Sequence, residues 1–232
     1  MRAMILAAGR GERLRPLTDS TPKPLLTVAG RPLIVHHLKA LAEAGVTRVV
    51  INLAWLGEQI RRSLGADAGL GLDIHYSPEP PGALETAGGI LQALDVLGPE
   101  PFLVISGDIH CDFPIKRLYG FEPDGQAHLV LVDNPAHHPG GDFGLDDNGR
   151  LDPDGEQRLT YSGIAVMTPE LFSGLAPGRR ALRPVLDRAL AAGQLTGEHY
   201  RGYWSDIGTP ERLEAARRAN AAGPATPPDC GD

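Results

Sequence analysis

Hydrophobic residues follow two alternating periods along this chain, and the alternation predicts its secondary structure. Apolar runs predict strands at residues 1–6, 48–53, 72–76, 102–106, 128–132 and 160–167. Apolar positions three or four apart predict helices at residues 32–44, 87–97 and 181–192, with a shorter helical stripe at Leu56, Ile60 and Leu64. A last helix is expected from Thr209-Pro210 to about residue 222, with threonine as cap and proline in the first turn. This alternation favours an α/β fold, with a mainly parallel central sheet and helices on both faces.

The middle and the end of the chain differ from the rest in composition. Residues 133–155 are rich in Asp, Asn, Pro and Gly, and Asp147-Asn148-Gly149 predicts a hairpin turn. Residues 223–232, which read GPATPPDCGD, are expected to be a disordered tail. We therefore expect one domain over residues 1–222.

The overall composition is that of an ordinary globular protein. The chain has 232 residues, of which 42% are hydrophobic and 22% are charged. No apolar stretch approaches the ~20 residues that a membrane helix needs, and the N-terminus has no signal pattern, so we expect no membrane partner. Cys111 follows a predicted strand and Cys230 lies in the predicted tail. We therefore expect no disulfide and a reducing, cytoplasmic setting.

Charge is distributed unevenly along the chain. The formal net charge is −7, which argues against general nucleic-acid binding. Residues 1–31 nevertheless hold six basic and two acidic side chains, a local charge of +4 that leaves −11 on the remainder. A positive segment on an acidic body suits a small anionic ligand rather than a polymer.

A glycine-rich segment follows the first predicted strand and carries these cations. Gly9 and Gly11 form the expected turn, Arg13 comes next, and Lys23 stands between two prolines that stiffen its segment. Backbone amides in a tight turn cradle anions, and glycine lets phosphates approach closely. The pattern predicts a triphosphate-binding loop. Gly9 and Gly11, taken by themselves, would also fit a plain structural turn, and Lys23 would also fit a solvated loop lysine.

Two better-known glycine loops do not match this segment. A P-loop requires Lys followed by Ser or Thr after its last glycine, and no such pair occurs here. The dinucleotide fingerprint G-x-G-x-x-G begins correctly at Gly9, but Leu14 stands at its third glycine position. That glycine is needed for close packing of helix on strand, so a Rossmann dinucleotide site is not expected.

The signature as a whole resembles that of the sugar-1-phosphate nucleotidyltransferases. The resemblance rests on residues 9–18 (GRGERLRPLT) and 21–25 (TPKPL), and it continues from Met1 to about Ala222. It implies a single nucleotidyltransferase domain with a Rossmann-like fold. It also implies the reaction, in which a sugar 1-phosphate attacks the α-phosphate of a nucleoside triphosphate and pyrophosphate leaves.

The resemblance further implies the roles of particular residues. Arg13 and Lys23 are expected to act on the phosphates, with Arg13 at the β- and γ-phosphates and Lys23 at the α-phosphate. The other expected nucleotide contacts are Ala8, Gly9, Gly11, Glu12, Glu79, Thr86, Gly88 and Ser106. Many relatives carry Asn at the position of Ser106. Thr86 can alternatively be read as the N-cap of the predicted helix at 87–97.

Two aspartates are candidates for a metal site. Asp108 directly follows the predicted strand at 102–106, and the carboxyl ends of parallel strands face the ligand crevice. Asp206 lies far away in sequence, and from the residues alone an ordinary turn aspartate is its simpler interpretation. The resemblance implies that both bind Mg²⁺, which prefers oxygen ligands and is usually held by one or two carboxylates plus substrate phosphates.

A narrower resemblance concerns the sugar. Residues 131–135, 137–143 and 197–202 resemble the bacterial enzymes of cell-wall recycling that transfer a uridylyl group from UTP to N-acetylmuramate 1-phosphate. In that group an aspartate matching Asp142 contacts the sugar, and Asp206 is expected to contact substrate as well. His137 and His138 are interpreted as loop histidines rather than zinc ligands, because adjacent residues in an extended loop point apart.

The chain also departs from the broader family. No Glu-Lys-Pro segment, whose lysine holds the sugar phosphate in relatives, occurs between Asp142 and Tyr161, and Arg158 is a conceivable substitute. The additional C-terminal domain of larger relatives is missing, so a monomer is plausible. Three alternatives stay open: another sugar 1-phosphate with dTTP or GTP, a cytidylyltransferase for an alcohol phosphate, and a silent nucleotide-binding regulator.

Overall fold

The computed structural model describes residues 1–80, 82–155 and 157–221. The predicted tail at 223–232 and Cys230 lie outside the described residues. None of the helices within these ranges is long and apolar enough to cross a membrane.

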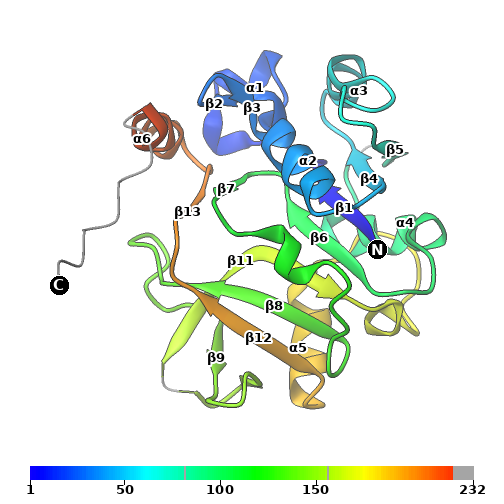
Figure 1. The fold of residues 1–232 in the computed structure, drawn as a ribbon, viewed down its shortest axis with the longest axis vertical. Helices are drawn as coiled ribbons and strands as arrows, with labels where there is room; N and C mark the ends of the chain where they lie inside the picture. Colours follow the sequence, from blue (N-terminus) through cyan, green and yellow to red (C-terminus); the bar gives the residue numbers. More distant parts are fainter. Residues whose placement is uncertain (81, 156, 222–232) are drawn as a thin grey trace, which may run out of the picture.

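Four parallel strands form the centre of the main sheet (Figure 1). They lie in the order β5 (Asp73–Pro78), β4 (Arg48–Leu53), β1 (Arg2–Leu6) and β6 (Phe102–Ser106). In the register of β1, Ile5 pairs with Ile51 on one side and with Ile105 on the other. Since these strands are parallel, the segments that follow β1, β4 and β6 all emerge at one edge of the sheet.

Antiparallel pairings extend the sheet beyond β6. The long strand β11 (Arg158–Met167) runs antiparallel to β6 and pairs further with β8 (Ala127–Val132) and β9 (Phe143–Leu145). Strand β12 (Leu195–Tyr200) adds in parallel to β8, and β10 (Leu151–Asp152) pairs with β9. The predicted Asp147-Asn148-Gly149 turn joins β9 to β10, with Gly149 at φ 76. The β12 strand was not predicted.

Helices cover both faces of the sheet, as the sequence predicted. Helices α2 (Leu33–Glu43) and α3 (Gly57–Leu64) pack on one face, and α4 (Glu85–Leu97) and α5 (Arg183–Ala191) on the other (Figure 1). Successive residues of β1 alternate between the two faces, so Ile5 joins the first core cluster and Met4 the second. The predicted α/β class with a mainly parallel central sheet is confirmed, and α4 begins at Glu85, so the reading of Thr86 as its N-cap is wrong.

A third, smaller core cluster lies under the glycine-rich segment. Its buried side chains are Leu14, Leu26, Val28, Leu33, Ile207, Leu213 and Ala216. Leu14 lies on η1 (Glu12–Leu14), Val28 on β2 (Thr27–Val28), Leu33 at the start of α2, and Leu213 and Ala216 on α6 (Pro210–Ala221). The other short elements of this segment are α1 (Leu17–Ser20), η2 (Lys23–Leu25) and β3 (Arg31–Pro32). The last described helix therefore supports the first loop of the chain.

A two-stranded ribbon connects the C-terminal part to the central sheet. Strand β7 (Ile109–Cys111) runs antiparallel to β13 (Trp204–Asp206), with Asp206 opposite Ile109. The Ile207 N–H donates to the Asp108 carbonyl oxygen at 2.7 Å. The remaining short helices are η3 (Ile115–Leu118) and η4 (Pro169–Phe172). This ribbon, also not predicted, brings the two candidate metal-binding aspartates together.

Candidate active site

A cavity of about 670 Å³, which we call the loop cavity, opens at the carboxyl ends of β1, β4 and β6. The loop after β1 supplies one wall, and the segments after β4 and β6 supply others. Residues predicted as nucleotide or catalytic contacts line it: Ala8, Gly9, Gly11, Glu12, Lys23, Thr86, Ser106 and Asp108. Their meeting follows from the parallel sheet, which delivers separate loops to one edge.

Gly9 and Gly11 of the loop differ in whether the structure requires a glycine at their position. Gly11 has φ +66, and a Cβ there would lie 2.9 Å from Thr18 Cγ2, so neither the backbone nor the space admits a side chain. Thr18 Oγ1 donates to the Gly11 carbonyl at 2.8 Å and fixes the turn. A Cβ at Gly9 would meet no atom of the described residues within 4 Å. Packing therefore explains glycine at position 11 only, and the space beside Gly9 belongs to the cavity.

Lys23 and Asp108 meet in this cavity from opposite sides. The Lys23 side chain is nearly buried, with the residue 8% exposed, and its Nζ donates to Asp108 Oδ2 at 2.5 Å. Lys23 opens the single turn η2 after the extended Pro22, which is the stiffened segment that the sequence predicted. An ammonium and a carboxylate held in a cavity of this size can each contact an anionic ligand or its counter-ion.

Asn52 supports the glycine loop, and sequence reasoning missed it. Its Oδ1 accepts from the Ala7 N–H at 2.7 Å, and its Nδ2 donates to Glu79 Oε1 at 2.6 Å. Glu79 Oε2 in turn accepts from the Leu84 N–H at 2.7 Å. Glu79 therefore anchors Asn52 and the start of α4, and it is not among the lining residues of the loop cavity within the described chain. The only sequence signal for Asn52 was a polar residue inside an apolar strand.

Arg13 and Gly88 do not line the loop cavity in the described part of the chain. Arg13 is exposed on η1. A Cβ at Gly88 would lie 2.3 Å from the Gly178 carbonyl oxygen, so this glycine admits the 178–180 loop. Arg10 lines the cavity instead, with its guanidinium carbon 4.6 Å from the Trp55 ring centroid.

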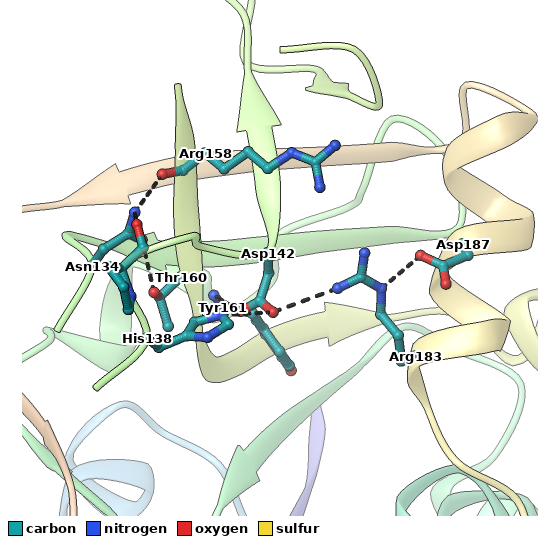
Figure 2. Close-up of polar contacts among 9 residues, drawn as sticks. Asn134, His138, Asp142, Arg158, Thr160, Tyr161, Arg183 and Asp187 are labelled. Atoms are coloured by element: carbon teal, nitrogen blue, oxygen red, sulfur yellow. Dashed lines mark hydrogen bonds and ion pairs between the residues drawn. The ribbon is translucent and has the colours of Figure 1, made fainter. Parts of the chain in front are cut away.

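A second cavity of about 500 Å³, the Asp142 cavity, adjoins the first. The two share the lining residues Leu6, Glu85, Thr86 and Ser106. Asp142 Oδ2 accepts from the Tyr161 N–H at 2.9 Å, and Oδ1 lies 3.2 Å from His138 Nε2 (Figure 2). Burial and the Asp142 carboxylate raise the pKa of the Tyr161 hydroxyl, so it stays protonated. Asp142 is thus fixed at one oxygen and faces the cavity beside Thr86 and Ser106.

Asp206 lies beside Asp108 through the β7–β13 ribbon, but its carboxylate is held by neighbours. It forms an ion pair with Arg212, and its Oδ1 lies 3.1 Å from His137 Nε2. His137 and His138 therefore point to different aspartates, Asp206 and Asp142, as expected for adjacent loop residues. Asp206 lines neither cavity within the described chain.

The residues present fit a magnesium ion shared with substrate. Within the described ranges no group of three or more His, Cys, Asp and Glu side chains could hold a metal ion by itself. Asp206 on β13 pairs with Ile109, the residue that follows Asp108, and the two carboxylates offer only oxygen ligands. Mg²⁺ usually takes one or two carboxylates and completes its shell with phosphates and water. The donor set therefore suits Mg²⁺ better than zinc, which favours nitrogen and sulfur ligands.

Two neutral histidines lie near the Asp108 turn. Burial lowers the pKa of His37 on α2 to about 4 and that of His110 on β7 to about 4. The His37 Nε2 atom has no hydrogen-bond partner among the described residues. Both histidine side chains beside the Asp108 turn are thus uncharged at neutral pH.

The geometry and the fold describe an α/β enzyme that binds phosphates, and comparison with known proteins makes the class definite. Residues 2–155 match the nucleotidyl transferase family, and the chain belongs to that family, which confirms the prediction. The chain is 50% identical over 224 residues to the N-acetylmuramate alpha-1-phosphate uridylyltransferase of Neisseria meningitidis serogroup B, covering 94% of this chain and 97% of that protein.

Two further similar proteins share less sequence identity with this chain. The catalytic subunit beta of a mannose-1-phosphate guanylyltransferase from Drosophila pseudoobscura pseudoobscura is 33% identical, covering 90% of this chain and 60% of that protein. Among solved structures, a Bacillus anthracis protein crystallised in complex with a sucrose superposes with a TM-score of 0.82 at 24% identity, covering 94% of this chain and 95% of that one. This structural likeness supports the fold alone.

Proposed function

We propose that this protein transfers a uridylyl group from UTP to N-acetylmuramate 1-phosphate, giving UDP-N-acetylmuramate and pyrophosphate, in the recycling of peptidoglycan. The observation that carries the proposal is the 50% identity to a uridylyltransferase of this specificity over nearly the whole of both chains. The guanylyltransferase relative is less similar and is covered over only 60% of its length. A cytoplasmic location belongs to the proposal, because UTP is an intracellular substrate.

The reaction is an in-line displacement at the α-phosphorus of UTP. A phosphate oxygen of the sugar 1-phosphate forms a bond to this phosphorus, the bond to the bridging oxygen breaks, and pyrophosphate leaves with the electron pair. The attacking phosphate is already an anion near neutral pH, so the step needs no general base. Positioning and charge neutralisation therefore supply the catalysis.

Different groups of the protein bind different phosphates of UTP. The amides of the Ala8–Gly11 turn bind the β- and γ-phosphates and the departing pyrophosphate. Arg13, which is exposed on η1 directly after this turn and does not line the cavity in the described chain, contacts the same phosphates from outside. Lys23, nearly buried in the loop cavity, neutralises the charge that develops at the α-phosphate. Arg10, held against Trp55, is a further cation on the same wall.

Asp108 and Asp206 are the residues that would hold Mg²⁺. When bound, the ion supplies positive charge that draws the two anionic phosphates together. Lys23 restrains the Asp108 carboxylate, and Arg212 and His137 restrain that of Asp206. In the adjoining cavity Asp142 contacts the sugar, with its geometry fixed by the Tyr161 N–H. A monomer suffices in this scheme, since every group comes from one chain.

Pyrophosphate release with Mg²⁺ tests the proposal. UTP, dTTP, CTP and GTP are each combined with the 1-phosphates of N-acetylmuramic acid, N-acetylglucosamine, glucose and mannose. We expect release with UTP and N-acetylmuramate 1-phosphate, and little with the other combinations. Preferred use of a neutral hexose 1-phosphate would keep the chemistry and overturn the sugar assignment. Nucleotide binding without release for any pair would instead favour a regulatory role.

A further inference from the structure

Arg183 is the only cationic side chain among the described residues that line the Asp142 cavity. It is the first residue of α5, and its side chain is 48% exposed. Figure 2 shows its guanidinium between the carboxylates of Asp142 and Asp187. The cavity otherwise presents two acidic side chains, Asp142 and Glu85, and Glu85 is paired with Arg179 at 2.9 Å.

Neighbouring side chains hold the guanidinium of Arg183 in place but do not occupy all of its N–H donors. Its Nε donates to Asp187 Oδ1 at 2.7 Å, and Nη1 lies 3.5 Å from Asp142 Oδ1. Its central carbon is 4.7 Å from the Phe143 ring centroid, a distance at which the ring restrains the guanidinium. Its Nη2 makes no hydrogen bond within the described residues. A guanidinium has five N–H donors, so Arg183 retains donors for an incoming anion.

The nearby arginine that the sequence suggested is arranged differently. Arg158 donates through Nη2 to the Pro153 carbonyl at 3.1 Å. In Figure 2 its guanidinium lies apart from the Asp142 carboxylate, and it lines neither cavity in the described chain. Arg183 is therefore the cation available to an anionic group of a sugar beside Asp142.

We propose that Arg183 binds the lactyl carboxylate of N-acetylmuramate 1-phosphate and thereby selects this sugar over its neutral counterpart. The proposal rests on the proposed function, because N-acetylmuramic acid differs from N-acetylglucosamine by an O-lactyl group that ends in a carboxylate. The planar fork of a guanidinium matches a carboxylate. Apolar side chains of Leu182 and Leu186 line the same cavity and suit the methyl group of the lactyl ether.

The test compares two isosteric substrates, N-acetylmuramate 1-phosphate and its lactyl carboxamide, which has the same shape without the charge. In the wild type we expect kcat/KM to be higher for the acid. In Arg183→Gln we expect kcat/KM for the acid to fall about 10- to 100-fold, the range for a hydrogen bond to a charged group. The carboxamide should change less than about threefold and the KM for UTP should stay constant, because the loop cavity is untouched.

Two further variants separate carboxylate binding from a structural role. Asp187→Asn removes the charge of the ion pair within α5 but keeps a side-chain oxygen that can accept from Arg183 Nε, so it should preserve the preference for the acid. Arg180→Gln removes an arginine of the adjoining segment whose Nε donates to the Ala176 carbonyl, and it should change neither substrate. Equal losses with acid and carboxamide in Arg183→Gln, or an equal loss of preference in Arg180→Gln, would overturn the proposal. Absence of wild-type turnover with N-acetylmuramate 1-phosphate would instead reject the proposed function itself.

Discussion

The loop cavity and the Asp142 cavity share a wall but are built by different means. The loop cavity depends on backbone: a glycine turn fixed by Thr18 and an amide anchored by Asn52, with the Lys23–Asp108 pair beside them. The Asp142 cavity depends on side chains from separate segments, tied by contacts of Asp142 with Tyr161, His138 and Arg183. Phosphates are common to all nucleoside triphosphates, whereas sugars differ, and side chains on loops can change without disturbing a fold.

The largest effect expected from this comparison lies at the centre of the loop cavity. Lys23→Ala removes the nearly buried cation and should lower kcat by at least ~10²–10³-fold, the loss seen when one transition-state charge contact is deleted. The fold should persist, because the side chain contacts Asp108 rather than a core cluster. Steady-state pyrophosphate release measures the rate, and circular dichroism checks the fold.

Lys39→Ala is the matched control for this variant. Lys39 lies on α2 and forms an exposed pair with Glu43, so its loss should leave turnover unchanged. Near-wild-type turnover of Lys23→Ala would show that the pair with Asp108 is structural only.

The same contrast explains how much could be predicted from sequence. The glycine loop and Lys23 form one contiguous segment, so the sequence alone pointed to a phosphate site there, and the parallel sheet followed from apolar periodicity. Asp142 was predicted only through resemblance, because nothing in its own neighbourhood distinguishes it from other loop aspartates. Arg183 had no sequence signal, since its position depends on how α5 packs against β12 and η4 and on the Phe143 ring beside its guanidinium.

Long-range pairing accounts for the other gaps. Asn52 acts through Ala7 and Glu79, contacts that span 45 and 27 residues of sequence separation. The β7–β13 ribbon pairs segments too short to show a period of two, so the approach of Asp206 to Asp108 was expected only from resemblance. The glycine at position 88 has a structural reason that the sequence did not reveal, because a side chain there would meet the 178–180 loop, and its contact with the nucleotide stays a prediction.

Asn52→Leu should break the support of the loop cavity while leaving the Asp142 cavity intact. The change deprives the Ala7 N–H of its acceptor and the Glu79 carboxylate of a donor, and a buried unsatisfied group costs about 1–3 kcal/mol. Urea unfolding should show that loss, and the Kd for UTP should rise. As a control, Asn220→Ala removes only a side-chain bond to the Ala216 carbonyl within α6 and should change stability by less than about 0.5 kcal/mol. Similar losses in both variants would mean that Asn52 has no special place in the loop.

The buried His37, near the Asp108 turn of the loop cavity, should make the stability of the protein depend on pH. The pKa of His37 is about 4 in the folded protein, whereas its ordinary value, which applies to the unfolded chain, is 6.5. As the pH falls, the unfolded chain therefore takes up the proton first. Stability from neutral His37 is therefore complete above about pH 6.5 and declines toward pH 4, by at most ~1.4 kcal/mol per pH unit. His37→Gln should reduce this slope in urea unfolding between pH 7 and 5, and His75→Gln, at an exposed histidine, serves as control. An unchanged slope in His37→Gln would assign the acid sensitivity to other groups.

The smallest effect is also the finest test of the loop cavity, because two glycines of one turn should fail in opposite ways. Gly9→Ala adds a methyl group that meets no described atom at a backbone without positive φ, so stability should stay constant or rise by about 0.4–1 kcal/mol. The Kd for UTP should nevertheless rise, by about tenfold if one phosphate contact is lost. Gly11→Ala, at φ +66 and 2.9 Å from Thr18 Cγ2, should lose stability instead.

Gly140→Ala completes this set, since its added methyl group also meets no described atom and Gly140 lines neither cavity. It should match Gly9→Ala in thermal stability and the wild type in UTP binding. Unfolding curves and calorimetric titration with UTP then separate space reserved for a ligand from space required by the fold. If Gly9→Ala bound UTP as tightly as Gly140→Ala does, the open space beside Gly9 would not be where the phosphates lie. The side chains of Arg10, Arg13 and Lys23 would then have to hold the triphosphate without a close approach to Gly9.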